Sequence, residues 1–269
     1  MTGRTAEEFE GSSVAVLSQK GGRTAAGTEE YRFRSASGSA TPMPFLTPSR
    51  AMLTTMATSI APSALDPENL PFPPGSSPFR VKGVFHKGNL DYLERVVPGG
   101  AAAVLARVAS APFRAFFEQP FVAASFYDVF PLAAISYPSA DMCSQSLERF
   151  LTLRARYQAE QQATGVYRSL LALSSPSAVA TKLPVLAAQL YDFGTTESRE
   201  VGPRQVEVAR GDLPALLMPW YVPGTEAYVV TALRLSGAKN PRASTSAYRH
   251  ARIASGLSIG TVTHTFSWD

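Results

Sequence analysis

The spacing of the apolar residues changes once along this chain, near Gly194, and this change limits the fold more than any other feature does. Before it, apolar residues recur with helical spacing, and the clearest predicted helix spans residues 139–162. After it, residues 204–210 (RQVEVAR) and 259–268 (IGTVTHTFSW) alternate as strands do, with a predicted helix at 225–237 between them. This order predicts an α+β fold in which N-terminal helices pack on a small antiparallel sheet near the C-terminus.

The N-terminal part of the chain has a different composition. Residues 57–78 are crowded with proline and serine, and residues 1–50 are rich in Ser, Thr, Gly, Ala and Arg without a sustained period. A segment of this composition cannot bury enough apolar surface to offset its ordering entropy. We therefore expect a disordered, Pro/Ser-rich segment over residues 1–78 and a single domain over residues 79–269. An alternative is a translation start at one of three methionines inside that segment, which are Met43, Met52 and Met56.

Charge and cysteine content exclude several classes of protein. The chain has 25 Lys and Arg against 21 Asp and Glu, a net charge of +4, and these residues are scattered. Proteins that bind nucleic acid cluster their basic residues, so we expect no nucleic-acid partner. A single cysteine, Cys143, forms no internal disulfide, which fits a reducing compartment. No stretch approaches the roughly 20 apolar residues that span a bilayer, and no signal-peptide pattern is present, so we expect a cytoplasmic protein.

One string, VAVLSQKGG at residues 14–22, looks like the start of a phosphate-binding loop. Such a loop ends in Gly-Lys-Ser/Thr, so that backbone amides and a lysine surround the phosphates. The chain continues with Arg23 and Thr24 instead. We therefore expect no nucleotide site there.

The three histidines, His86, His250 and His264, have no nucleophile motif or metal-ligand spacing around them. We expect His86 to be half exposed at the end of a strand over residues 80–85, His250 to lie in a solvated basic hairpin, and His264 to share a face with Phe266. The sequence thus predicts no catalytic residue, no metal ligand and no cofactor, and a protein that is not an enzyme. An enzyme whose acidic and basic groups converge from distant positions is the alternative.

Aromatic residues are concentrated between residues 113 and 130. The simplest interpretation is a core wrapped by short helices. The alternatives are an apolar pocket for a hydrophobic ligand or a patch that pairs with another subunit. The candidate pocket residues are Phe117, Phe121, Phe126, Tyr127 and Phe130.

Arg154 falls on the apolar stripe of the helix predicted at 139–162. An arginine in that position either extends its charged group to solvent or pairs with a buried carboxylate. We favour pairing, and the candidate partners are Asp128 and Asp192.

Several blocks of the domain, taken in order, resemble a known family. They are VKGVFHKGNLDYLERV (81–96), FYDVFPLAAI (126–135), the phrase over 165–194, PGTEAYVVTALRLSGAK (223–239) and THTFSW (263–268). On these blocks, residues 80–269 resemble a myxobacterial paralogous family of unknown function. That family resembles in turn the ligand-binding fold shared by haem-nitric-oxide sensors (HNOB), V4R regulatory domains and Bet3-type vesicle-tethering subunits. The resemblance implies an HNOB/V4R/Bet3-like fold, with helices before a small antiparallel sheet.

The resemblance also bears on the ligand. Haem-binding members need an axial histidine on a helix and a Tyr-x-Ser-x-Arg triplet for the propionates. The corresponding helix here, residues 175–193, has no histidine, and the triplet does not occur. We therefore expect a non-enzymatic regulatory or sensor domain that binds a small hydrophobic ligand without haem. The alternative is a dimeric protein–protein interaction module, like the tethering relatives, with an exposed apolar face on the helix at 139–162.

Overall fold

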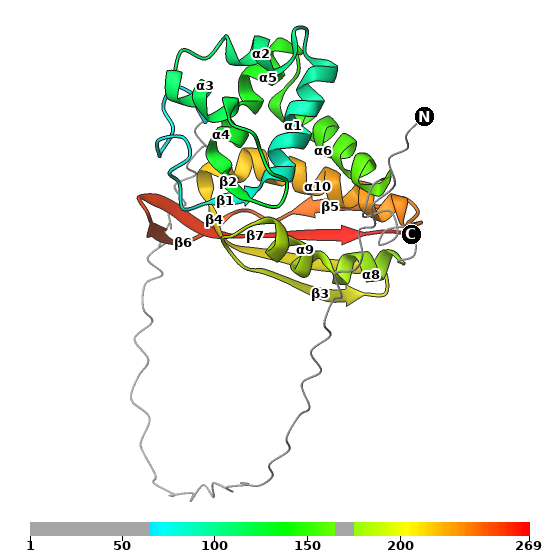
Figure 1. The fold of residues 1–269 in the computed structure, drawn as a ribbon. Helices are drawn as coiled ribbons and strands as arrows, with labels where there is room; N and C mark the ends of the chain where they lie inside the picture. Colours follow the sequence, from blue (N-terminus) through cyan, green and yellow to red (C-terminus); the bar gives the residue numbers. More distant parts are fainter. Residues whose placement is uncertain (1–64, 165–174) are drawn as a thin grey trace, which may run out of the picture. The chain divides into compact units, whose positions relative to one another are not determined.

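The computed structural model describes residues 65–164 and 175–269. The predictions for residues 1–64, including the string at 14–22 and the alternative start sites, lie outside these residues. In the described part, helices come first and an antiparallel sheet follows, as Figure 1 shows. The predicted α+β class is confirmed.

The first part of the domain interleaves a short antiparallel strand pair with helices. In chain order its elements are β1 (Arg80–Lys82), α1 (Gly83–Val96), α2 (Gly100–Leu105), α3 (Ala111–Glu118), β2 (Phe126–Asp128), α4 (Val129–Ala134), α5 (Ser136–Met142) and α6 (Leu147–Thr164). The second part holds α8 (Pro176–Thr181), α9 (Leu183–Leu190), β3 (Thr196–Gly202), β4 (Gln205–Pro214), the 3-10 turn η1 (Ala215–Leu217), α10 (Met218–Leu235), β5 (Arg242–Thr245), β6 (Arg249–Ala254) and β7 (Leu257–Ser267).

The main sheet is antiparallel, with strand order β3-β4-β7-β5 and with β6 also paired to β7. The register places Val206 opposite Phe266 and Val208 opposite His264. These four side chains are buried on one face of the sheet, because alternate side chains of a strand point to the same side. Apolar residues of α8, α9 and α10 cover that inner face.

Helix α10 joins the sheet to the helical part, because it contacts β5 on one side and runs along α6 on another (Figure 1). It starts at Met218 rather than at the predicted residue 225, since Pro223 lies inside the helix and does not end it. Trp220 and Tyr221, in the first turn, are both buried. Burial of two large aromatic side chains offsets the hydrogen bond that a proline cannot donate.

The helix predicted at 139–162 is two helices in the structure, α5 and α6. Ser144 adopts a left-handed backbone conformation with a φ of 51°, which ends the run after α5. The hydroxyl of Ser146 accepts a hydrogen bond from the amide of Arg149 and so caps the start of α6. The apolar spacing continues across this break, which is why the sequence pattern did not reveal it.

Residues 65–78 pack on the domain, although the sequence analysis assigned them to a disordered segment. Leu65 is buried, and the ring of Phe72 lies 5.6 Å from that of Phe130. The carboxylate of Asp128 accepts hydrogen bonds from the backbone amides of Gly75 and Ser77. The composition of this segment did not predict its packing, because the contacts depend on a few apolar side chains and on one carboxylate that is distant in the sequence. The domain therefore extends back at least to Leu65.

Candidate ligand-binding site

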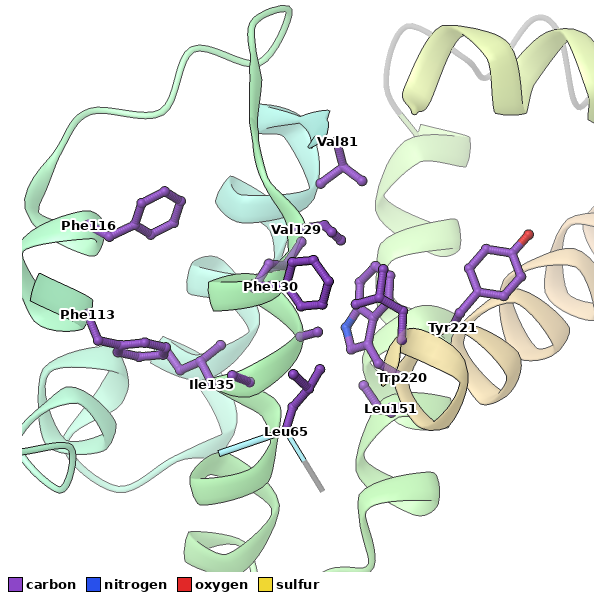
Figure 2. Close-up of a cluster of buried hydrophobic side chains, with 14 of the residues drawn as sticks. Leu65, Val81, Phe113, Phe116, Val129, Phe130, Ile135, Leu151, Trp220 and Tyr221 are labelled. Carbon is purple, nitrogen blue, oxygen red and sulfur yellow. The ribbon is translucent and has the colours of Figure 1, made fainter. Parts of the chain in front are cut away.

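The aromatic residues predicted to form a pocket lie in or beside the main hydrophobic core. Phe130 is fully buried, and its ring lies 6.0 Å from that of Phe79. Figure 2 shows Phe130 within a cluster of apolar side chains, on the side of Trp220 at the start of α10. A ring distance of this size is that of a contacting aromatic pair, so the Phe130 ring is part of the packed core.

The other four predicted pocket residues differ in burial. Phe117 and Phe121 are buried, and Phe126 and Tyr127 are half-buried. None of the five candidates lines the pocket described below. Three of the five candidates, Phe117, Phe121 and Phe130, are core residues and Tyr127 packs against that core. Aromatic content alone does not distinguish a filled interior from a cavity wall.

His86 lies on α1 and is fully buried, not half exposed, because β1 ends at Lys82 and the helix starts one residue later. Its ring stacks on Phe121 at 4.6 Å, and Nε2 lies 3.1 Å from the backbone oxygen of Asp128. Burial lowers the pKa of His86 to about 4, so the imidazole is neutral at physiological pH. Its surroundings are those of a core residue.

His264 and His250 lie elsewhere. His264 stacks on Phe266 at 5.8 Å, as its place on the strand predicted, and its Nδ1 lies 2.7 Å from the hydroxyl of Thr245. Burial lowers the pKa of His264 to about 4 as well. His250 is exposed on β6 beside the hydroxyl of Ser258. The three histidines therefore lie on α1, β6 and β7, each with partners of its own.

A pocket of about 90 Å³, partly open to solvent, lies where α6, α9 and α10 meet the inner face of the sheet. Its lining is mainly apolar, and among the described residues it includes Phe85, Leu183, Leu186, Leu190, Val208 and Val229. A single water needs roughly 10–15 Å³ of such space, so the pocket has room for a small molecule. It lies below the roughly 300 Å³ at which pockets for drug-sized ligands begin.

One wall of this pocket carries the buried side chain of Arg154, which is only 3% exposed. Its guanidinium lies over the indole ring of Trp220, 5.5 Å from the ring centroid, and Nη1 donates a long hydrogen bond of 3.4 Å to Asn89 Oδ1. Nε has no hydrogen-bond partner among the described residues. Burial lowers the pKa of Arg154 to about 10, which leaves the group charged at neutral pH.

Tyr191 and Tyr221 also line the pocket. Burial raises the pKa of both phenols, so both stay protonated at neutral pH. A second buried arginine, Arg210 on β4, lies behind Tyr191, with its guanidinium 4.8 Å from the centre of that ring. Arg210 donates hydrogen bonds to Thr196 Oγ1 at 2.9 Å and to the backbone oxygen of Phe193 at 2.6 Å.

The ion pair expected for Arg154 is not formed with either predicted carboxylate. Asp128 caps the start of α4 by accepting the amide of Phe130 at 2.9 Å, in addition to the amides described above. Asp192 accepts a hydrogen bond from the guanidinium of Arg80 and forms an ion pair with it. Both carboxylates are therefore satisfied by nearer donors, and Arg154 has the neutral amide of Asn89 and an aromatic ring instead.

The sequence contained one signal for this site. Arg154 stood on an apolar stripe, and the structure confirms that it is buried. Leu186 and Leu190 of α9 are half-buried around the pocket, and nothing in their spacing indicates this. The pocket is lined by elements that are distant in the chain, from α1 to β7, and a local pattern does not reveal such an arrangement.

Comparisons with known proteins place the fold. No family model and no curated protein matches the chain. Among solved structures, a Cs H-NOX mutant carrying 4-cyano-L-phenylalanine matches with a TM-score of 0.52 and 8% identity, over 70% of this chain and 96% of that chain. A point variant of Tt H-NOX matches with a TM-score of 0.51 and 9% identity, over 70% of this chain and 92% of that chain. The domain therefore has the α+β fold of H-NOX domains; at such low identity the similarity shows the fold alone.

The described residues also bear on membrane and metal binding. Among them no helix is both long and apolar enough to span a membrane. In the same residues, no three His, Cys, Asp or Glu side chains come together in a way that could hold a metal ion.

Proposed function

We propose that this domain is a non-enzymatic regulatory or sensor module that binds a small hydrophobic ligand, without haem, in the pocket between α6, α9, α10 and the sheet. The observation that carries the proposal is the pocket itself, since apolar side chains from the helical part and from the sheet surround one cavity. The H-NOX-like fold supports it as the scaffold of a ligand-binding domain.

The location of the pocket fits a sensor. Its walls include α6 from the first part of the chain and α9, α10, β4 and β7 from the second. A ligand would therefore contact both parts at once. A ligand changes an equilibrium between two arrangements only by its difference in affinity for them, and a site with walls from both parts offers such a difference.

Haem is the group that the fold implies, and the lining does not fit it. Among the described lining residues there is no histidine, cysteine or methionine, the side chains that most often hold haem iron. Tyrosine binds iron as the phenolate, and burial of Tyr191 and Tyr221 disfavours that form. The pocket volume of about 90 Å³ is also small for a macrocycle.

A filled-pocket variant tests the proposal. Ala187 lines the pocket, whereas Ala188, the next residue of α9, is exposed. Fluorobenzene, followed by ¹⁹F NMR, is the probe, since an apolar cavity of comparable size takes up benzene. We expect Ala187→Phe to weaken binding at least tenfold and Ala188→Phe to leave it unchanged. Equal binding by both variants, or no binding by the unmodified protein, would overturn the proposal.

The dimeric module has no specific support. The apolar face of α6, which was the candidate contact surface, is buried within the domain through Phe150, Leu151 and Ala155. The most exposed large apolar side chains, Val185 and Ile253, lie on different elements. Membership of the myxobacterial family, a cytoplasmic location and the absence of enzyme activity stay predictions.

A further inference from the structure

The pocket combines an apolar wall with a buried positive charge that has no anionic partner among residues 65–164 and 175–269. No carboxylate of the described residues lies within ion-pair distance of Arg154. Its polar contacts in the described residues are the long hydrogen bond to Asn89 and the ring of Trp220. A buried charge without a counter-charge is costly, and arginine does not relieve the cost by losing its proton.

A second donor lies beside it on the same helix face. Gln158 follows Arg154 by four residues, so the two side chains are neighbours on α6. Gln158 is buried, lines the pocket, and its Nε2 has no hydrogen-bond partner among the described residues. Three buried donors of the lining, Arg154 Nε, Gln158 Nε2 and Trp220 Nε1, thus have no hydrogen-bond partner among the described residues. No side-chain acceptor of the described lining residues is both buried and unsatisfied.

An unsatisfied buried polar group in a native structure calls for a partner. Hydrogen-bond donors are complementary to acceptors, and a positively charged guanidinium is complementary to an anion. A carboxylate is the acceptor that a guanidinium matches best, because its two oxygens take parallel N–H donors from the planar fork. The apolar side chains around these donors call for a short hydrocarbon or aromatic body.

We propose that the pocket binds a small organic anion, a carboxylate on a short apolar or aromatic body, whose charged group meets Arg154 and Gln158. This rests on the proposed function and specifies the ligand class of the same site. The pocket volume of about 90 Å³ suits a body of a few carbons or one ring. Gly224 leaves space for a ligand to approach the guanidinium. It lines the pocket without a side chain, and a Cβ at this position would lie 3.7 Å from Arg154 Nη2.

Matched probe pairs test this inference. Butyrate is compared with butyramide and benzoate with benzamide, because each pair has nearly one shape and differs in charge. Binding to the full chain at pH 7 is measured by calorimetry and by the shift in unfolding temperature. We expect each carboxylate to bind at least tenfold more tightly than its amide.

Substitutions on α6 test which side chain causes the preference for carboxylates over amides. Arg154→Met should reduce the carboxylate-to-amide ratio to below threefold while fluorobenzene still binds. Arg156→Met is the matched control, because it removes the same charge from an exposed position two residues away, and it should leave the ratio unchanged. Gln158→Met, which leaves the charge in place, should weaken carboxylate binding about threefold and serves if Arg154→Met does not fold.

The outcomes separate this inference from the proposed function. Equal binding of carboxylates and amides, or an unchanged ratio in Arg154→Met, overturns the anion while fluorobenzene binding keeps the apolar site. If fluorobenzene and both carboxylates fail to bind, the site and its ligand class are overturned together.

Discussion

Two buried regions of this domain contain stacked aromatic rings and a titratable side chain, but they differ in charge. In the first, His86 stacks on Phe121 at 4.6 Å and is neutral, because burial lowers its pKa to about 4. In the second, Arg154 lies over Trp220 at 5.5 Å and keeps its positive charge. The first region is filled by its own side chains, and the second borders a cavity.

The difference shows what marks a candidate site in such a domain. Aromatic residues are abundant in both regions, so their number does not locate a ligand. A buried charge without a partner among the described residues, next to a pocket, is a better indicator of a ligand site. A bound ligand can supply the counter-charge that the described side chains do not. Three measurements test this difference between the filled region and the region beside the pocket.

The largest expected effect is on stability in the filled region. Phe130→Ala should lower the free energy of unfolding by about 3–5 kcal/mol, since Phe130 is fully buried among other rings. Leu186→Ala, on the half-buried pocket wall, should cost about 1 kcal/mol, because a cavity already exists there. Urea unfolding of both variants is the measurement. Equal losses would mean that the two regions are filled alike.

The next effect is the response to acid. His86 and His264 have folded-state pKa values of about 4, below the unfolded value of 6.5, so the unfolded state binds more protons between these values. The free energy of unfolding should fall as pH is lowered through this window, by about 2 kcal/mol between pH 6 and pH 5 for the two groups together. Burial raises the pKa of Asp128, which offsets part of the loss.

Urea unfolding at several pH values measures this slope. His86→Phe keeps an aromatic ring beside Phe121 and should reduce the slope by about half. A slope unchanged in this variant would show that His86 is not buried as a neutral ring.

The smallest effect concerns the charged region without ligand. Arg154→Met should raise the free energy of unfolding by about 1 kcal/mol, because it removes an unpaired buried charge and keeps an apolar side chain of similar length. Arg156→Met, on the exposed side of the helix, should change it by less than about 0.5 kcal/mol. A loss above about 2 kcal/mol in Arg154→Met would mean that the charge is well paired inside the protein.

Much of the fold could be predicted from the spacing of the apolar residues and from the order of the predicted helices and strands. The alternation of residues 204–210 appears as β4 and that of 259–268 as β7, because each strand has one face buried and one face open. The predicted helix boundaries were wrong where the backbone conformation of a single residue determines them. Ser144 in a left-handed conformation divides one apolar stripe between two helices, and Pro223 sits inside α10 although proline usually ends a helix.

The site followed less well from the sequence. The apolar stripe drew attention to Arg154 and left open whether its charge is paired or reaches solvent. Its partner depended on tertiary distances, and Asp192 lies beside Arg80 instead. The pocket itself depends on how α6, α9 and α10 are spaced over the sheet, and side-chain periodicity contains no information on such spacing. Unsatisfied donors such as Gln158 Nε2 are visible only once every neighbour is placed.

The hydrogen bonds from Gly75 and Ser77 to Asp128 have a practical consequence for work with recombinant protein. A fragment that starts at Phe79, where composition changes, would remove two of the three amides that this carboxylate accepts and would uncover the Phe130 ring on the side of Phe72. Solubility screens, crystallisation trials and NMR samples of this domain should therefore begin at or before Leu65.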